Sequence, residues 1–580
     1  MNLNIISRVC RLAVIGAILF CSASCIAIDE KLGENFIPTD QKWNVYNPEA
    51  VELKDVYMHM SDSLSGYSTS RFTFGSVKDG VLGTSIKSTS FTLVPRADTI
   101  DFGKNTVIRQ FHFTAVKDTL STVYENQYGM LQNVYVSELK KALDSTVLYT
   151  GAFTDEKIRA EFLDLENRIT VGVPVYDGGD SLSFDFDKEW TKKFMEKVQK
   201  ADLDSMDLYI QSVPGIFITT DTPAGLGGRI NMFKLPIGTE DGYITGNYAE
   251  LKITANYDYS DQPVDTSFLF YFGPSDFVEA KAAKFPTQFA FNSSDHETVK
   301  EYKDGVKAKD IIYVEGGAGV KPVVKAAEIK EILDSLVAAA GITDPSEVVI
   351  NKATITLPFE VSGNYSALDK YPMYLSPTVR LRSSSGDYVS YAGLTDASIA
   401  SENQGDINRS LLNYAPDISH HVQEILRLDK NDENFSKKIE SYDIWFLIMY
   451  SEKEVGQSST GYNEYYQNLL YNSYYNSMMY DPYGYGYGYG GYGGYGGYGG
   501  YGGYGGYGGY GGYGGYGSNY YNYMMMAAYA SGYSGSSSDN NYTVELDKDR
   551  FYNAILTGPA ATSEIKPNLK VIFSAPLTAE

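Results

Sequence analysis

The chain has 580 residues, 72 of them acidic and 48 basic, which gives a formal net charge of −24. A surface with this charge repels nucleic acids and anionic lipid headgroups, so a phosphate-attracting field is excluded as the basis of function. The length is enough to bury a large core and predicts two or more domains. Only three cysteines are present, all within the first 25 residues, which excludes disulfides and cysteine metal sites further along.

The N-terminus is typical of a lipoprotein signal peptide over residues 1–24. Arg8 and Arg11 precede a short apolar run, 12–20, and the small residues 22–24 are followed by Cys25. A basic segment, an apolar core and small residues at the cleavage point are the marks of a secretion signal. We therefore predict lipid attachment at Cys25 in the outer membrane. The alternative is an uncleaved anchor, but residues 12–28 are marginal for crossing a hydrocarbon core of about 30 Å.

Residues 25–50 are expected to form a tether. Asp29 and Glu30 follow the cysteine closely and resemble the surface-export signals of Bacteroidetes-type lipoproteins. We expect exposure at the cell surface, with the periplasmic face as the alternative.

From about Val51 onward, most of the chain alternates apolar and polar residues, as half-buried strands do. The pattern is clearest in the segments 109–115, 250–257, 348–357, 442–450, 542–546 and 570–573. Such runs, separated by short turns, favour β-sandwiches over an α/β sheet. We predict a mainly β fold with two sandwich-like, jelly-roll-type domains, the first at 51–280 and the second at 281–456, completed by closing strands in 542–580.

Three helices are expected to cover the sandwich ends. Residues 187–201 place Trp190, Phe194 and Val198 on one stripe, and residues 325–340 stop at Gly341, a suitable residue after a helix end. Asp417 is expected to cap a third helix that runs to Leu426. These stripes indicate core packing rather than a cofactor site.

Residues 457–541 form a Gly/Tyr-rich low-complexity insertion. There is no charged residue from Pro482 to Ser538, and Gly-Gly-Tyr repeats run up to Tyr516. Glycine at this density makes an ordered backbone costly, and polar-aromatic tracts tend to be disordered and self-associating. We predict a disordered loop between two strands of one domain. A sticky surface and a repeat without a role are both open interpretations.

Six stretches, in order, resemble one family: Gly75–Thr84, Asn133–Leu139, Pro214–Ile218, Val349–Ala353, Tyr414–Leu426 and Lys566–Ile572. The family is the Bacteroidetes lipoprotein group catalogued as domain of unknown function 4270. The resemblance runs from about Leu32 to Ala575, without the Gly/Tyr tract. It implies a β-rich outer-membrane lipoprotein with no enzymatic activity attached to the family and no catalytic residues to carry over.

The sequence offers no strong chemical motif. The five histidines lack metalloprotease spacing, and the adjacent pair His420 and His421 point in different directions on a helix. Gly316–Gly319 lacks the third glycine of a dinucleotide loop and is interpreted as a turn, and Gly225–Gly228 precedes a strand rather than a helix.

Two acidic clusters are weak calcium candidates because they lack the spacing of a calcium loop: Asp177, Asp180, Asp185 and Asp187, and the stretch 429–434. We therefore expect no cofactor and no catalytic or metal-binding residues. The acids are too numerous for a glycosidase pair to be nominated from sequence.

The sequence predicts a non-enzymatic lipoprotein that acts as a binding or assembly accessory to envelope proteins, such as outer-membrane barrels or other lipoproteins. The alternative is a glycan-binding surface module, by analogy with other β-sandwiches. Few tryptophans are available as sugar platforms, since only Trp43, Trp190 and Trp445 are present. An enzyme is a third hypothesis, which requires carboxylates that converge in a cleft.

Overall fold

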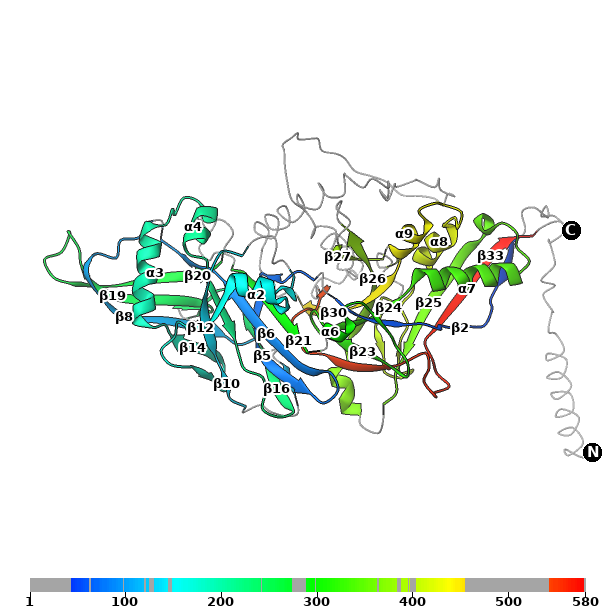
Figure 1. Cartoon of the computed structure of the whole chain (residues 1–580), viewed down its shortest axis with the longest axis horizontal. Coiled ribbons are helices and arrows are strands. Elements are labelled where there is room, and N and C mark those ends of the chain that lie inside the picture. Colours follow the sequence, from blue (N-terminus) through cyan, green and yellow to red (C-terminus); the bar gives the residue numbers. More distant parts are fainter. Residues whose placement is uncertain are drawn as a thin grey trace, which may run out of the picture.

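The computed structural model describes residues 43–577, except for 62–63, 98, 119–121, 125–129, 144–148, 241–242, 274–287, 298, 362–364, 383–387, 395, 397–402 and 454–541. The predicted mainly β fold is confirmed, because the described strands pair in several antiparallel sheets. The sheets form two halves that lie end to end (Figure 1). The predicted signal peptide, Cys25 and the Gly/Tyr-rich insertion lie outside the described residues. None of the described helices has both the length and the apolar character needed to cross a membrane.

The first half packs a nine-stranded sheet on a five-stranded sheet. The larger sheet consists of β4 (Tyr67–Ser68), β5 (Arg71–Asp79), β6 (Gly83–Phe91), β9 (Thr122–Tyr124), β11 (Tyr135–Leu139), β12 (Leu163–Arg168), β15 (Ile216–Thr219), β16 (Gly227–Lys234) and β21 (Ala290–His296). The smaller sheet consists of β7 (Leu93–Pro95), β8 (Lys104–Val116), β14 (Ser181–Asp185), β19 (Tyr248–Asn256) and β20 (Val264–Phe272). The expected strands 109–115 and 250–257 are found as β8 and β19, which pair with each other.

Phenylalanine side chains join the two sheets of the first half. Phe91 of β6 stacks on Phe272 of β20 with ring centroids 4.2 Å apart, and Phe72 of β5 meets Phe113 of β8 edge to face. Aromatic pairs of this kind contribute about 0.5–1.5 kcal/mol each beyond the area they bury. The two inner faces therefore share one core, as in a sandwich.

Helix α3 (Lys188–Lys200) covers this core, as predicted. Oδ1 of Asp187 accepts hydrogen bonds from the backbone N–H groups of Glu189 and Trp190, which caps the first turn. Trp190, Phe194 and Val198 are buried against Phe111 and its neighbours. The first half also contains η4 (Ala152–Thr154), α2 (Glu156–Phe162) and α4 (Met206–Ser212), and the two-stranded ribbons β10 (Gln132–Asn133) with β13 (Val175–Tyr176) and β17 (Gly238–Glu240) with β18 (Tyr243–Thr245).

The second half packs a six-stranded sheet and a seven-stranded sheet around another core. The six-stranded sheet consists of β1 (Trp43–Tyr46), β2 (Val51–Glu52), β25 (Val349–Pro358), β28 (Ile407–Asn408), β29 (Asn413–Tyr414) and β33 (Asn568–Pro576). The seven-stranded sheet consists of β3 (Tyr57–Met60), β22 (Val306–Lys307), β24 (Val320–Val324), β26 (Tyr374–Arg382), β27 (Tyr388–Gly393), β30 (Ile444–Lys453) and β31 (Tyr542–Leu546). A separate two-stranded ribbon of β23 (Ile311–Glu315) and β32 (Asn553–Thr557) completes the second half.

The other predicted helices lie on this second core with α6 (Val299–Tyr302), α9 (Phe435–Glu440), η5 (Pro345–Glu347) and η6 (Tyr365–Lys370). Helix α7 (Ala326–Ala339) matches the expected segment, and Gly341 follows it with φ of +75°. Helix α8 (Ser419–Arg427) also forms, and the predicted Asp417 accepts from the N–H of its first residue, but a second acidic residue supplies most of the cap. Asp396, far back in the sequence, accepts hydrogen bonds from the N–H groups of His420 and His421, whereas Asp417 bonds Ser419.

Strand pairing divides the chain differently from the expected boundaries at 51 and 281. Strand β3 pairs with β24 in the second half, and β21 pairs with β6 in the first. The last part of the expected tether, 43–46, forms β1 on β33. Pairing depends on partners far away in sequence, so local composition does not reveal it. The chain therefore begins in the second half, builds the first half, and returns.

The Gly/Tyr-rich insertion is flanked by two strands that pair directly. The predicted strands 442–450 and 542–546 are β30 and β31, and Lys453 lies opposite Tyr542. The insertion thus occupies the position of a hairpin loop within the second half, as the sequence predicts.

Candidate functional site

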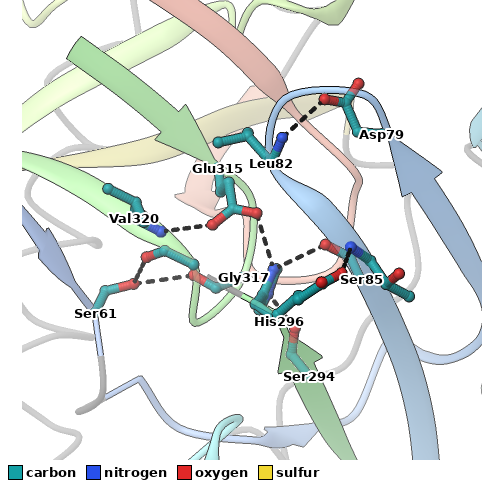
Figure 2. Close-up of polar contacts among 12 residues, drawn as sticks. Ser61, Asp79, Leu82, Ser85, Ser294, His296, Glu315, Gly317 and Val320 are labelled. Carbon is teal, nitrogen blue, oxygen red and sulfur yellow. Dashed lines mark hydrogen bonds and ion pairs between the residues drawn. The ribbon is translucent and has the colours of Figure 1, made fainter. Parts of the chain in front are cut away.

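The contact between the two halves is an unusually polar, buried region. We call the junction cluster the set of side chains Ser61, Ser85, Lys87, Ser294, His296, Glu315 and Lys321, with the turn Gly316–Gly319. It brings β6 and β21 of the first half against β23, β24 and the end of β3 from the second (Figure 2). The halves therefore meet through buried hydrogen bonds, beside a small apolar contact of Val77 and Ile230 with Phe551.

His296 stands at the centre of the junction cluster. Its Nε2 is 2.6 Å from Ser294 Oγ, and its Nδ1 is 2.9 Å from Ser85 Oγ and 3.3 Å from Glu315 Oε1. Figure 2 shows Glu315 between His296 and the backbone N–H of Val320, which donates to Oε2 over 3.2 Å. Both ionisable side chains are nearly inaccessible, with 3% exposure for His296 and 1% for Glu315.

A serine, a histidine and a carboxylate that are hydrogen-bonded in this order also form the catalytic triad of serine hydrolases. Here the serine and histidine are two residues apart on one strand, and all three groups are buried where the two halves meet. Ser294 is 2% exposed, and its Oγ bonds His296 Nε2. The arrangement links β6 and β21 of the first half to β23 of the second.

Two buried lysines complete the junction cluster. Lys321 Nζ donates to the carbonyl oxygens of Glu315, Gly317 and Gly319 and to Ser61 Oγ, at 2.5–3.2 Å. Burial lowers the pKa of Lys321 to about 7, although the charge of Glu315 opposes the shift. Burial likewise lowers the pKa of Lys87 to about 8, and its Nζ donates to the carbonyl of Lys548 across the junction.

Further cross-junction contacts surround the cluster. Arg71 pairs with Asp118 at 3.2 Å and also donates to the hydroxyl of Tyr450 in the second half, at 2.8 Å. Asn292 donates to Asp549, a carboxyl whose pKa is raised by burial. Since removal of one member of a buried ionic set leaves its partner uncompensated, this network makes separation of the halves costly.

A separate surface pocket of about 220 Å³ lies on the first half. It is bounded by β6, β11, β12, β15, β21 and helix α2, and Phe153 and Phe217 contribute apolar surface. Ser293, Ser294 and Asp295 of β21 all line the pocket, and the Ser294 hydroxyl also bonds His296 of the junction cluster. Strand β21 therefore contributes to both features.

Two polar pairs form opposite walls of the pocket. On one wall, the hydroxyl of Tyr135 donates to Asp221 Oδ2 over 2.5 Å, and the Arg168 guanidinium lies 4.1 Å from the Tyr135 ring centroid. On the other wall, Arg159 Nη2 donates to Asp295 Oδ2 over 3.0 Å. Within the described part of the chain, the buried Nε–H of Arg159 has no hydrogen-bond acceptor.

The structure disperses the acidic cluster around residue 180. Asp187 caps α3, Asp185 Oδ1 accepts from His112 and Gln110, and Asp177 closes a turn on Gly179. In the stretch 429–434, Asp429 and Asp432 also bond their own turns. Among the described residues no three metal-ligating side chains come together.

The structure also places the glycine-rich turns, the histidine pair and the tryptophans that were considered in the sequence. Gly316–Gly319 is a turn closed by a hydrogen bond from Gly319 N–H to the carbonyl of Gly316, as predicted, and β16 follows Gly225. His421 is buried, and burial lowers its pKa to about 4, while its Nε2 lies 2.8 Å from the carbonyl of Tyr442. Trp190 and Trp445 are buried and Trp43 is half exposed.

Sequence reasoning missed both the junction cluster and the pocket. The alternation Asn292, Ser294, His296 places polar side chains on a face where a core is expected, which is the one local signal of a buried polar contact. Cys25, the predicted lipidation site, lies outside the described residues. Comparison with known protein families, with curated proteins and with solved structures gives no match to this chain.

Proposed function

We propose that this protein is a non-enzymatic lipoprotein, attached through Cys25 to the outer membrane and exposed at the cell surface, that serves as a binding or assembly accessory to envelope proteins. Outer-membrane barrels and other lipoproteins are the partners that fit this location. The proposed location rests on the signal-like segment 1–24 and on the cysteine that follows it. The family resemblance of the six motifs agrees with it.

The observation that carries the binding role is an exposed apolar patch on the first half. We call the ribbon patch the residues Leu131, Val171, Val173 and Val175, which are 50–66% exposed. They lie beside the β10–β13 ribbon, where Asn133 pairs with Val175 and the N–H of Val134 donates to Pro174. A group of exposed apolar side chains marks an interaction surface more often than isolated ones do.

The position of the patch suits a tethered protein. The described chain starts at β1, which pairs with β33 at the end of the second half, and the first half lies at the opposite end (Figure 1). Seventeen residues lie between Cys25 and Trp43, so the lipid attachment would lie within about 65 Å of β1. The ribbon patch would then lie on the half that is further from the anchor.

In-cell crosslinking followed by capture of the full-length protein tests this proposal. Wild type should recover a reproducible barrel or lipoprotein partner, and the double variant Val173→Asp, Val175→Asp should lose it. Val107→Asp is the matched control, because Val107 is equally exposed on β8, away from the ribbon. Recovery of the lone monomer from wild type, or full recovery of the partner with the double variant, would overturn the proposal.

A further inference from the structure

The pocket between α2 and the larger sheet of the first half has the chemistry of a ligand site. Arg159 and Arg168 balance Asp221 and Asp295, so the charged groups around the pocket sum to zero. A phosphate or a carboxylate would meet two carboxylates at close range, in a protein that is already strongly acidic. The pocket therefore favours a neutral ligand.

Two carboxylate oxygens at the pocket remain as hydrogen-bond acceptors. Within the described residues, Oδ1 of Asp221 and Oδ1 of Asp295 accept no hydrogen bond, since the known donors go to Oδ2 in each case. The Arg159 Nε–H also lacks an acceptor among these residues, but it is buried away from the pocket space, so a ligand would meet the carboxylate oxygens instead.

These groups are also held in place. Asp221 is fixed by hydrogen bonds from Tyr135 and from Asn133 Nδ2, and the salt bridge to Asp295 fixes Arg159. On the sheet between them, Ser88 Oγ and Thr219 Oγ1 bond each other at 2.7 Å. Side chains that are already oriented lose little freedom when a ligand binds.

We propose that this pocket binds one neutral sugar ring. Sugar hydroxyls are hydrogen-bond donors, so they can donate to Asp221 Oδ1 and Asp295 Oδ1. The apolar face of the ring would lie on Ile86 and Leu165, which line the pocket and are half-buried. The volume of about 220 Å³ lies below the range of about 300–1,000 Å³ typical of sites for drug-sized ligands, which suits a single ring at the end of a glycan.

The pocket is set up for binding rather than for cleavage. Glycoside hydrolysis needs one protonated carboxyl as the acid and a second carboxylate as base or nucleophile. Asp295 accepts from a guanidinium, and Asp221 accepts from a hydroxyl and an amide. Neither is placed as a proton donor. The proposal is independent of the ribbon patch, so the two can fail separately.

The test uses the purified chain without its signal peptide and a panel of methyl glycosides of neutral hexoses, a methyl uronide and free amino acids. Saturation-transfer NMR identifies binders and calorimetry gives their affinity. We expect at least one neutral glycoside to bind saturably. Asp221→Asn, which can turn the acceptor into a donor while keeping the side-chain volume, should weaken binding at least tenfold, as should Arg159→Met.

Asp258→Asn is the matched control, because Asp258 is an exposed carboxylate paired with Lys104 outside the pocket. This variant should bind the glycoside with the same affinity as wild type. Thermal unfolding of each variant shows that it is folded. Absence of neutral binders, binding confined to the uronide or amino acids, wild-type affinity in Asp221→Asn, or turnover of aryl glycosides would overturn the proposal.

Discussion

At the scale of single residues, the notable feature is the number of ionisable groups buried where the halves meet. Lys87, Lys321, His296 and Glu315 all lie under the surface, each with hydrogen-bond partners. Burial of charge destabilises a fold unless the charge is paired, and replacement by apolar residues is often neutral. The cluster therefore defines how the halves dock more than it adds stability.

The depressed pKa of Lys321 makes stability depend on pH. Its folded pKa is about 7, whereas a lysine in the unfolded chain titrates near 10.5. Between these values the unfolded chain binds more protons, so stability rises with pH from about 7 upward. The gain is at most about 1.4 kcal/mol per pH unit for this group. Lys87 adds a similar rise from about pH 8.

Urea unfolding of wild type and Lys321→Met at pH 7, 8 and 9 measures this effect. We expect a shallower rise in the variant, even if its stability is lower at every pH. Lys104→Met, which changes an exposed lysine, should retain the wild-type slope. An unchanged slope in Lys321→Met would show that the lysine is not held in the buried state described here.

At the scale of elements, Asp396 tests the capping of α8. Its carboxylate receives two backbone N–H groups of the first turn, at 2.6 and 3.1 Å. Asp396→Ala should destabilise the protein by about 1–2 kcal/mol, at the upper end for a lost cap because the site is buried. Chemical unfolding measures the loss. Asp344→Ala, an exposed cap of the short η5, should cost less. Equal losses of unfolding free energy in the two variants would contradict the role of Asp396 as a buried cap of α8.

The second element-scale prediction concerns the Gly/Tyr tract. The tract replaces a hairpin loop between β30 and β31, so deletion of residues 484–517 shortens a loop without removing core. Closure entropy should then improve by only about 0.4 kcal/mol. We expect a nearly unchanged melting temperature by calorimetry. A large loss of cooperativity would mean that the tyrosines pack. Unchanged cell-surface adhesion in a folded deletion variant would favour a repeat without a role.

The elements differ in how far the sequence predicts them. Helices α3 and α7 were predictable because their apolar stripes and end signals, Asp187 and Gly341, are local. The capping of α8 by Asp396 was not predictable, since Asp396 lies more than twenty residues before the helix begins. The placement of β3 and β21, and the meeting of His296 with Glu315, depend on pairing between distant strands. The pocket likewise needs five strands and α2 at once.

At the scale of the whole molecule, the junction should make the two halves unfold together. Glu315→Ala removes one of the two partners of His296 Nδ1, which keeps Ser85, and removes the side-chain acceptor of the buried Val320 N–H. We expect a loss of about 3–5 kcal/mol and the separation of one calorimetric transition into two. Glu52→Ala, which breaks an exposed pair with Lys566, should leave one transition. Two transitions in wild type would contradict a coupled junction.

The proposed role depends on the anchor more than on any other feature, because a binding accessory at the cell surface must be held there. Metabolic labelling of cells with a fatty-acid analogue, comparing wild type with Cys25→Ala, tests this directly. We predict label on wild type, recovered in the outer-membrane fraction, and none on the variant. Equal incorporation in both proteins, or none in wild type, would contradict lipid attachment at Cys25.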